Sequence, residues 1–320
     1  MKPVTQIICS VIFSMLICQF AYITLNNGLK KYNIHKTERL AELFLGHSKY
    51  NLLFIGSSKT HTGINPRVID SICKLNSYNA GVEGGNLFEF NMTFEAYLEA
   101  HPAPEYLVLT IDLNSFDLKR KFFNYSQYFP YVENKIIHKT LNENSQHTGL
   151  LKIFPFLVLT DYDDYTKRNA IKGLTGEVEI PKGDFAYKGY LSNSENYISE
   201  FSAPVKSKKY EISPAGVKYL DHIIKLCKEH HTILIFTYAP EFKSGLQKQT
   251  SNSKEIFTVI KNSADKNKIT YLRDDSLGIC NDPKLFANPG HLNKHGADVY
   301  SAILADEINL LGKSGFRRFR

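Results

Sequence analysis

Short apolar runs alternate along the chain with segments of helical periodicity, and this alternation constrains the fold more than any other feature. Four proline-free runs have the length and residue types of buried strands, and they cover residues 52–55, 106–111, 232–238 and 269–272. Apolar residues recur every three or four positions in four further segments, at 66–73, 87–97, 214–227 and 297–311. Strands that alternate with helices are typical of a parallel sheet covered on both faces. We therefore predict an α/β domain with a mostly parallel sheet flanked by helices.

A charge-free run occupies residues 4–25, and no charged residue occurs between Lys2 and Lys30. Twenty-two helical residues span about 33 Å, which is enough to cross the hydrocarbon core of a bilayer. The alternative is a cleaved signal peptide, but the run is long for one and no small-x-small cleavage site follows it. We predict one N-terminal transmembrane helix, with residues 1–29 as an uncleaved membrane anchor and residues 30–48 as a juxtamembrane segment.

Composition fits a packed domain and excludes wholesale disorder, since 43% of the residues are hydrophobic and 22% are charged. The net charge of +7 is spread along the chain without a zinc-finger, basic-zipper or RNA-binding signature, so no nucleic-acid partner is expected. Zinc-ligand spacings, the phosphate-loop pattern and the dinucleotide fingerprint GxGxxG are also missing from the sequence. The sequence thus indicates no metal and no organic cofactor.

Two segments depart from the alternating pattern. Residues from about 118 to 209 are rich in Tyr and Phe and form a predicted insertion. Its aromatic side chains either build a core of their own or line a substrate groove. The basic tail at 312–320 either touches lipid headgroups or frays as chain ends commonly do.

Polar and glycine residues gather in four short segments at the ends of the predicted elements. They are residues 54–66, which contain Gly-Ser-Ser after the first strand, the glycine-rich stretch 78–86, residues 107–114, and residues 286–296 before the last helix. Ligands of parallel sheets bind at the carboxyl ends of the strands. A serine in such a turn becomes a nucleophile when a base such as histidine lies beside it.

In this order and spacing, the four segments resemble the SGNH (GDSL-like) hydrolase superfamily. More narrowly, they are similar to its membrane-anchored bacterial branch, which includes alginate-type O-acetylation proteins and the D-alanine transfer protein of teichoic acids. The start GSSxTxxGIxP and the end HLNxxG are the most specific parts. The resemblance covers roughly residues 49–118 and 211–311, and it implies an SGNH-like three-layer α/β domain over residues 49–311.

The resemblance implies a nucleophile, a base and an acid. Ser58 matches the nucleophile, as the third residue of the family's Gly-x-Ser, and Ser57 stands where the family usually has Asp. His291 matches the general base, whereas Asn288 occupies the place of the acid. An asparagine oxygen accepts the imidazole proton but brings no charge, and in serine proteases Asp→Asn costs ~10⁴ in turnover. Three outcomes stay open: a Ser–His dyad, a borrowed carboxylate such as Asp282, or weak catalysis.

The resemblance also implies the oxyanion hole. Gly84 matches the glycine whose N–H contributes to the hole, with Gly81 or Gly85 in its place if the register slips, and Asn114 matches the asparagine donor. His61 lies three residues after the serine. It is either an accessory residue of the site or an ordinary turn histidine.

By this resemblance, the chain is expected to be an acyltransferase, with acetyl as the expected group, or an esterase. The implied partners are an envelope polysaccharide or another acylated glycan, the membrane, and a membrane-bound acyltransferase. The implied domain location is outside the cytoplasm, but the basic residues at 30–39 favour the cytoplasm by the positive-inside rule. We follow the resemblance, because a single span with few charges specifies its orientation weakly. The alternative function is a catalytically inactive glycan-binding or assembly subunit in surface polysaccharide biosynthesis, which Asn288 and the aromatic insertion motivate.

Overall fold

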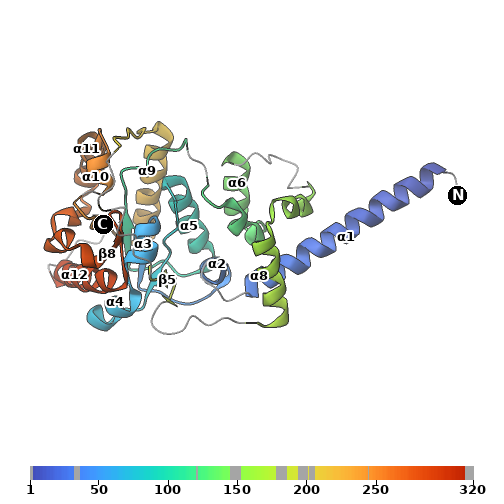
Figure 1. Ribbon diagram of the computed structural model, residues 1–320, viewed down its shortest axis with the longest axis horizontal. Helices are drawn as coiled ribbons and strands as arrows, with labels where there is room; N and C mark the ends of the chain where they lie inside the picture. Colours follow the sequence, from blue (N-terminus) through green and yellow to red (C-terminus); the bar gives the residue numbers. More distant parts are fainter. Residues whose placement is uncertain are drawn as a thin grey trace. The chain divides into compact units, whose positions relative to one another are not determined.

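A computed structural model describes residues 3–31, 37–119, 122–144, 153–177, 186–193, 201, 206–243 and 245–313 (Figure 1). It contains two compact units. One combines Met1–Phe44 with Asn124–Ile180, and the other combines Leu45–Phe123 with Pro181–Arg320. The N-terminal segment thus groups with residues 124–180, which lie within the predicted insertion.

The larger unit is built on a five-stranded sheet in the order β2-β1-β3-β6-β7. All neighbouring strands pair in parallel. The strands are β1 (Leu52–Ile55), β2 (Ser77–Asn79), β3 (Tyr106–Thr110), β6 (Ile233–Tyr238) and β7 (Thr270–Arg273). The chain runs from β1 to β2 on one side and returns to β3 on the other, so the strand order reverses between β1 and β3. Crevices at such a reversal, outside the carboxyl ends of the strands, are where open α/β sheets bind ligands.

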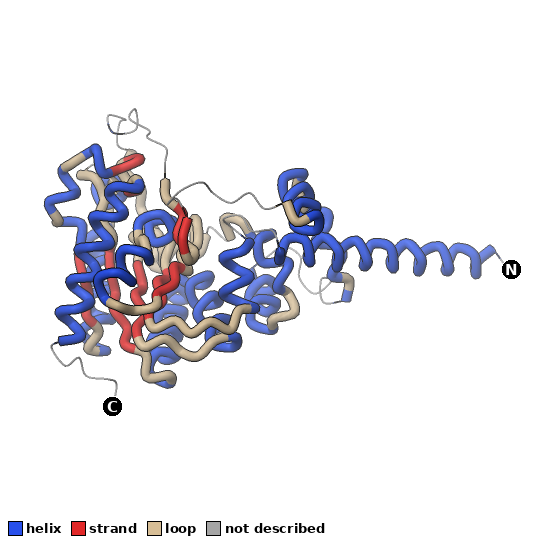
Figure 2. The backbone as a smooth tube through the Cα atoms, turned by 90° about the horizontal axis from the view of Figure 1, so that it is seen from below, coloured by secondary structure: helices blue, strands red, loops and turns tan. Residues whose placement is uncertain are grey.

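Helices cover both faces of this sheet (Figure 2). On one face, α4 (Pro66–Cys73) packs against α12 (Lys294–Lys313), and on the other α5 (Leu87–Ala100) packs against α9 (Pro214–Glu229). The alternation of side chains along β1 agrees with this, because Leu52 and Phe54 join the α4–α12 cluster while the equally buried Leu53 lies outside it. The predicted three-layer α/β class is confirmed. Helix α11 (Ser253–Asn267) contacts the edge strand β7.

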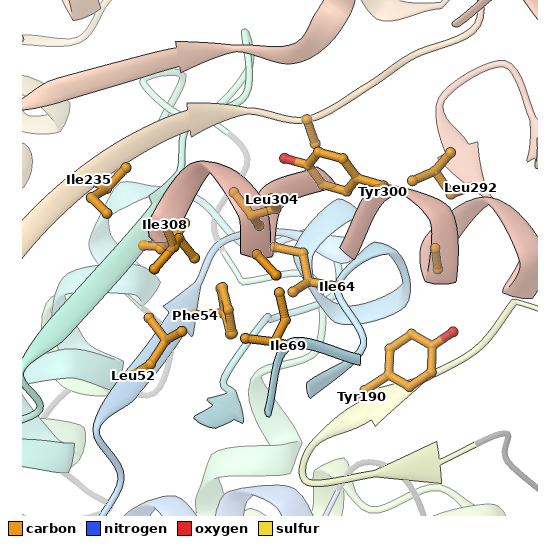
Figure 3. Close-up of a cluster of buried hydrophobic side chains, with 14 of the residues drawn as sticks. Leu52, Phe54, Ile64, Ile69, Tyr190, Ile235, Leu292, Tyr300, Leu304 and Ile308 are labelled. Atoms are coloured by element: carbon orange, nitrogen blue, oxygen red, sulfur yellow. The ribbon is translucent and has the colours of Figure 1, made fainter. Parts of the chain in front are cut away.

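A cluster of buried side chains joins α12 and α4 to the sheet (Figure 3). Phe54 of β1 and Ile69 of α4 are fully buried there beneath Tyr300, Leu304 and Ile308 of α12. These three residues of α12 recur at helical spacing, as the sequence predicted.

The GIxP part of the first motif has a structural role at this junction. Asn65 caps α4, accepting from the backbone N–H of Arg67 at 3.0 Å. Its own backbone N–H donates to the Ser301 hydroxyl of α12 at 2.7 Å, and its side-chain amide donates to Asp298 at 2.7 Å. The segment after Ser58 is thereby fastened to the helix that follows His291.

The remaining elements of the larger unit are short. They are α3 (Ser58–Gly63), β4 (Ala186–Tyr187), β5 (Tyr190–Leu191), α10 (Leu246–Gln249), η4 (Asp274–Ser276), η5 (Gly278–Asn281), η6 (Pro283–Leu285), β8 (Phe286–Asn288) and β9 (His291–Leu292). Strands β4 and β5 form one antiparallel hairpin, and β8 and β9 form another.

The smaller unit is helical. It contains α1 (Pro3–Lys31), α2 (Thr37–Leu45), η1 (Tyr125–Tyr131), α6 (Lys135–Asn144), η2 (Pro155–Asp161) and α8 (Asp164–Thr175). Several aromatic residues of the predicted insertion are buried within this unit, among them Tyr128, Phe129 and Tyr162. These side chains form a core of their own.

Helix α1 has two different parts. Its N-terminal part is apolar and exposed, and the helix is long and apolar enough to span a membrane. Its C-terminal turns belong to the core of the smaller unit, where Tyr22, Asn26 and Leu29 are buried. At Gly28, α8 lies so close that a Cβ would sit 2.0 Å from the carbonyl oxygen of Ala170, so only glycine fits. The predicted basic tail at 312–320 falls largely outside the described residues, which end at Lys313.

Substitution of Leu304 by Ala should destabilise the protein strongly. Leu304 is 0% exposed on the buried face of α12, so its loss leaves a cavity worth about 2–5 kcal/mol in the free energy of unfolding. Leu310 on the same helix is 66% exposed, and Leu310→Ala should stay within about 0.5 kcal/mol of wild type. Denaturant titration of the full chain in detergent measures both. Equal losses of unfolding free energy in Leu304→Ala and Leu310→Ala would contradict the burial of the α12 face that carries Leu304.

Candidate active site

A tight turn between β1 and α3 presents Ser58 at the carboxyl edge of the sheet. The Ser57 hydroxyl oxygen caps α3 by accepting from the backbone N–H of Lys59 at 3.2 Å. The turn begins at Gly56, where a Cβ would lie 2.1 Å from the Thr60 hydroxyl oxygen and 2.8 Å from Thr110. Only glycine fits there, and the helix then starts at Ser58, whose hydroxyl oxygen lies 2.8 Å from Nε2 of His291.

His291 reaches Ser58 from the short β8–β9 hairpin. Its Nδ1 lies 3.0 Å from Oδ1 of Asn288, the residue that occupies the place of the acid. The same Oδ1 accepts from the backbone N–H of Gly290 at 3.0 Å. Because this N–H can only donate, it fixes the Asn288 amide with its oxygen toward the imidazole. Nδ1 then carries the proton, and Nε2 is left to accept the proton of Ser58.

Burial and charge keep the imidazole of His291 neutral. The pKa of His291 lies below its ordinary value of 6.5, first because burial disfavours the charged form and second because Lys59 is positive. The carboxyl groups of Asp112, Glu241 and Glu83 act in the opposite direction and raise this pKa. A histidine that is neutral near pH 7 is suited to act as a general base.

The oxyanion-hole candidates lie in loops at the same edge of the sheet. Gly84 has a left-handed backbone with φ of +65°, which favours glycine. The N–H groups of Gly81 and Gly85 are already used, since they donate to the Asn79 side chain and to the Val82 carbonyl at 2.9 Å each. By contrast, the Gly84 N–H has no protein acceptor among the residues that the structure describes. Gly84 is therefore the glycine of this loop that has an N–H to offer.

Asn114 follows β3, which pairs in parallel with β1 through Ile55 and Leu109, so the two strands end side by side. Its side chain is partly exposed, and its amide has no protein acceptor in the described part of the chain. The asparagine thus remains available as a donor at the edge that carries Ser58.

The two accessory candidates have different surroundings. Asp282 is exposed and caps η6 by accepting from the Lys284 N–H at 2.9 Å. It therefore does not serve as the borrowed acid, since Asn288 occupies Nδ1 of His291. His61 is buried in α3, with its backbone against Gly81. No cluster of three or more His, Cys, Asp or Glu side chains suited to a metal occurs among the described residues.

Sequence reasoning missed a buried charge cluster directly behind Ser58. The Lys59 ammonium forms ion pairs with Asp112, at 3.3 Å, and with Glu241. All three side chains are nearly sealed from solvent, with exposures of 7%, 3% and 3%. The available signal was a lysine immediately after the nucleophile and an aspartate just after β3. The second partner of Lys59, Glu241, lies 182 positions away in the sequence, which no local pattern reveals.

No family model matches this chain, and no curated protein matches it significantly. One similar solved structure is a protein of Desulfitobacterium hafniense that is provisionally named as a lipolytic protein of the G-D-S-L family. The two sequences are 11% identical, the match covers 80% of this chain and 97% of that chain, and the TM-score is 0.42. Another is a Bacteroides fragilis protein provisionally named as an acylhydrolase, with 15% identity, 87% and 97% covered, and a TM-score of 0.39. We base the proposed function on the side-chain geometry.

Substitution of Asn288 by Asp should raise the pKa of His291 from the lowered value that it has in the wild type. The aspartate keeps the oxygen that faces Nδ1 and adds a negative charge, which favours the imidazolium. Histidine-selective NMR titration measures this pKa, with the resonance assigned from a His291→Gln sample. An unchanged pKa would contradict the contact between residue 288 and Nδ1.

Proposed function

We propose that this protein is a membrane-anchored acyltransferase or esterase of the SGNH type that acts on an acylated glycan of the cell envelope. One observation carries the proposal: the Ser58 hydroxyl and Nε2 of His291 lie 2.8 Å apart at the carboxyl edge of the sheet, although 233 positions separate them in the chain. A serine paired in this way with an oriented histidine is the arrangement of a nucleophile and its base.

In the proposed reaction, Ser58 attacks the carbonyl carbon of an ester and its proton moves to Nε2 of His291. The N–H of Gly84 and the amide of Asn114 would stabilise the oxyanion, where the loss of one donor typically costs ~10²–10³ in rate. His291 then donates its proton to the leaving alcohol, which leaves the acyl group on Ser58. Water completes an esterase cycle, and a sugar hydroxyl completes a transferase cycle.

Asn288 favours a dyad oriented by a neutral amide over a full triad. Its oxygen sets the tautomer of His291, as an acid does, but it brings no charge to stabilise the imidazolium. This missing charge is also the observation that favours the alternative function, a catalytically inactive glycan-binding or assembly subunit.

The structure of α1 supports an uncleaved anchor. Cleavage after the apolar run would remove Tyr22, which is buried in the smaller unit. An anchored enzyme meets substrates that are themselves held at the cell envelope. The family resemblance adds a membrane-bound acyltransferase as the proposed donor of the acyl group.

Ser58→Ala should abolish ester hydrolysis and labelling by a serine-directed fluorophosphonate, because the substitution removes the nucleophile. The measurement uses the full chain in detergent, with p-nitrophenyl acetate as substrate and peptide mapping of the labelled residue. Ser276→Ala is the matched control, since Ser276 is exposed in η4 and should leave both readouts at the wild-type level. If wild type and Ser58→Ala hydrolyse the ester equally and neither is labelled, the inactive-subunit alternative replaces the proposed function.

A reporter fused to the C-terminus should locate the domain outside the cytoplasm. Alkaline phosphatase, which is active only outside, should show activity, and green fluorescent protein, which Sec export leaves dark, should not fluoresce. The opposite pattern would mean that Lys30 and Lys31 set the orientation by the positive-inside rule.

A further inference from the structure

The cluster formed by Lys59, Asp112 and Glu241 is unusual because it buries charge next to the nucleophile. Charged side chains are seldom sealed from solvent, and a buried ion pair often adds less stability than apolar residues of the same volume. The contacts of the cluster place it between the segments that carry the candidate catalytic groups.

The first link joins the nucleophile turn to the ends of β3 and β6. Ser57 donates its hydroxyl proton to Asp112, and its oxygen accepts from the N–H of Lys59. The ammonium of Lys59 binds Asp112 at 3.3 Å and also binds Glu241. Both residues that flank Ser58 are thus held by carboxyl groups of other segments.

The second link joins the end of β6 to the hairpin that carries His291. Glu241 is fixed by the Tyr238 hydroxyl at 2.7 Å and by the N–H of Gln247 at 2.9 Å. The next residue, Phe242, donates its N–H to the carbonyl oxygen of Pro289 at 2.9 Å. Pro289 lies in the turn between Asn288 and His291. Hydrogen bonds and ion pairs, joined by the backbone between Glu241 and Phe242 and between Pro289 and His291, therefore connect the Ser58 turn to the base.

The charge of the cluster complements what Asn288 lacks. The cluster contains two carboxyl groups and one ammonium group, and His291 senses all three, since Lys59 lowers its pKa while Asp112 and Glu241 raise it. Glu83, in the glycine-rich loop, acts in the same direction as the two carboxyl groups. A partly buried group such as His291 is sensitive to such fixed charges.

We propose that this cluster takes over both tasks of the missing acid: Lys59 is a positioning residue that holds the Ser58 turn at His291, and the surplus carboxyl group stabilises the imidazolium during acyl transfer. This inference rests on the proposed function, since it assumes that His291 gains a proton during the reaction. It adds Lys59, Asp112 and Glu241 to the residues on which turnover depends.

The test uses Lys59→Met and Glu241→Gln in the full chain in detergent, with two readouts. By NMR titration, Lys59→Met should raise the pKa of His291 because a positive charge is lost, and Glu241→Gln should lower it because a negative charge is lost. In ester hydrolysis, kcat should fall ~10²-fold in both variants with a smaller change in KM. This is the effect expected when Ser58 is displaced relative to His291. Opposite pKa changes are a signature that a merely structural role does not produce.

Two further variants complete the design. Lys59→Arg keeps the charge, so it should leave the pKa of His291 near the wild-type value and retain more turnover than Lys59→Met. Lys188→Met is the matched control, because Lys188 is a half-buried lysine of the same unit that pairs with Asp70 at 2.6 Å. It should change neither the pKa of His291 nor kcat. If Lys59→Met does not fold, Glu241→Gln and Lys59→Arg still decide the question.

The outcomes separate this inference from the proposed function. Turnover that depends on Ser58, together with a His291 pKa that is the same in all folded variants, overturns the inference and leaves the function standing. Opposite pKa changes in a protein without Ser58-dependent turnover overturn the proposed function and support the electrostatic link. A parallel change of the pKa in Lys59→Met and Glu241→Gln also overturns the inference, because it indicates general loosening of the site.

Discussion

The parallel pairing of β1 with β3, and of β3 with β6, is the constraint on which the rest of the site depends. In parallel strands the carboxyl ends lie at one edge, so the residues that follow the three strands meet without any further arrangement. That edge receives Ser58 after β1, Asp112 after β3 and Glu241 after β6. The base, His291, does not follow a strand of this sheet. Its position is set by the packing of α12 on α4 and of α3 on β9. The hairpin of His291 is thereby carried to the same edge, and a hydroxyl and an imidazole from opposite ends of the domain come within hydrogen-bond distance.

Sequence patterns predicted the elements whose apolar residues repeat regularly. The apolar runs of β1, β3 and β6 and the apolar face of α12 are confirmed as buried elements, and the run at β7 is confirmed as a strand that lies at the sheet edge and is only partly buried. The motif resemblance identified Ser58 and His291 as partners, and the structure brings them together. Strand β2 is not evident from its sequence, because it is three residues long and contains Ser77 and Asn79, which are buried through contacts distant in sequence. The packing of α1 on α8 joins segments more than 130 positions apart, and composition alone does not reveal such a contact.

Asn288 shows why the two effects of an acid in a triad should be considered separately. In the serine-protease template, replacing Asp by Asn is harmful because the imidazole adopts the wrong tautomer. Here the N–H of Gly290 holds the amide oxygen toward Nδ1, so the amide cannot turn its donor group to the imidazole without losing that bond. The orientation of His291 is therefore preserved by two residues of one hairpin. What the amide cannot supply is charge, and a charge acts over several ångströms and need not come from the residue in contact with Nδ1.

This distinction explains why a lysine with two carboxyl partners is buried beside a site that has lost its own carboxylate. If stability were the only demand, apolar residues of the same volume would serve as well or better. A lysine alone would oppose the imidazolium, as the lowering of the pKa of His291 by Lys59 shows. The two carboxyl groups oppose that effect while they also hold the lysine in place. The same ion pairs thus fix the geometry of the Ser58 turn and set the sign of the charge behind it, so neither property can be altered by substitution without disturbing the other.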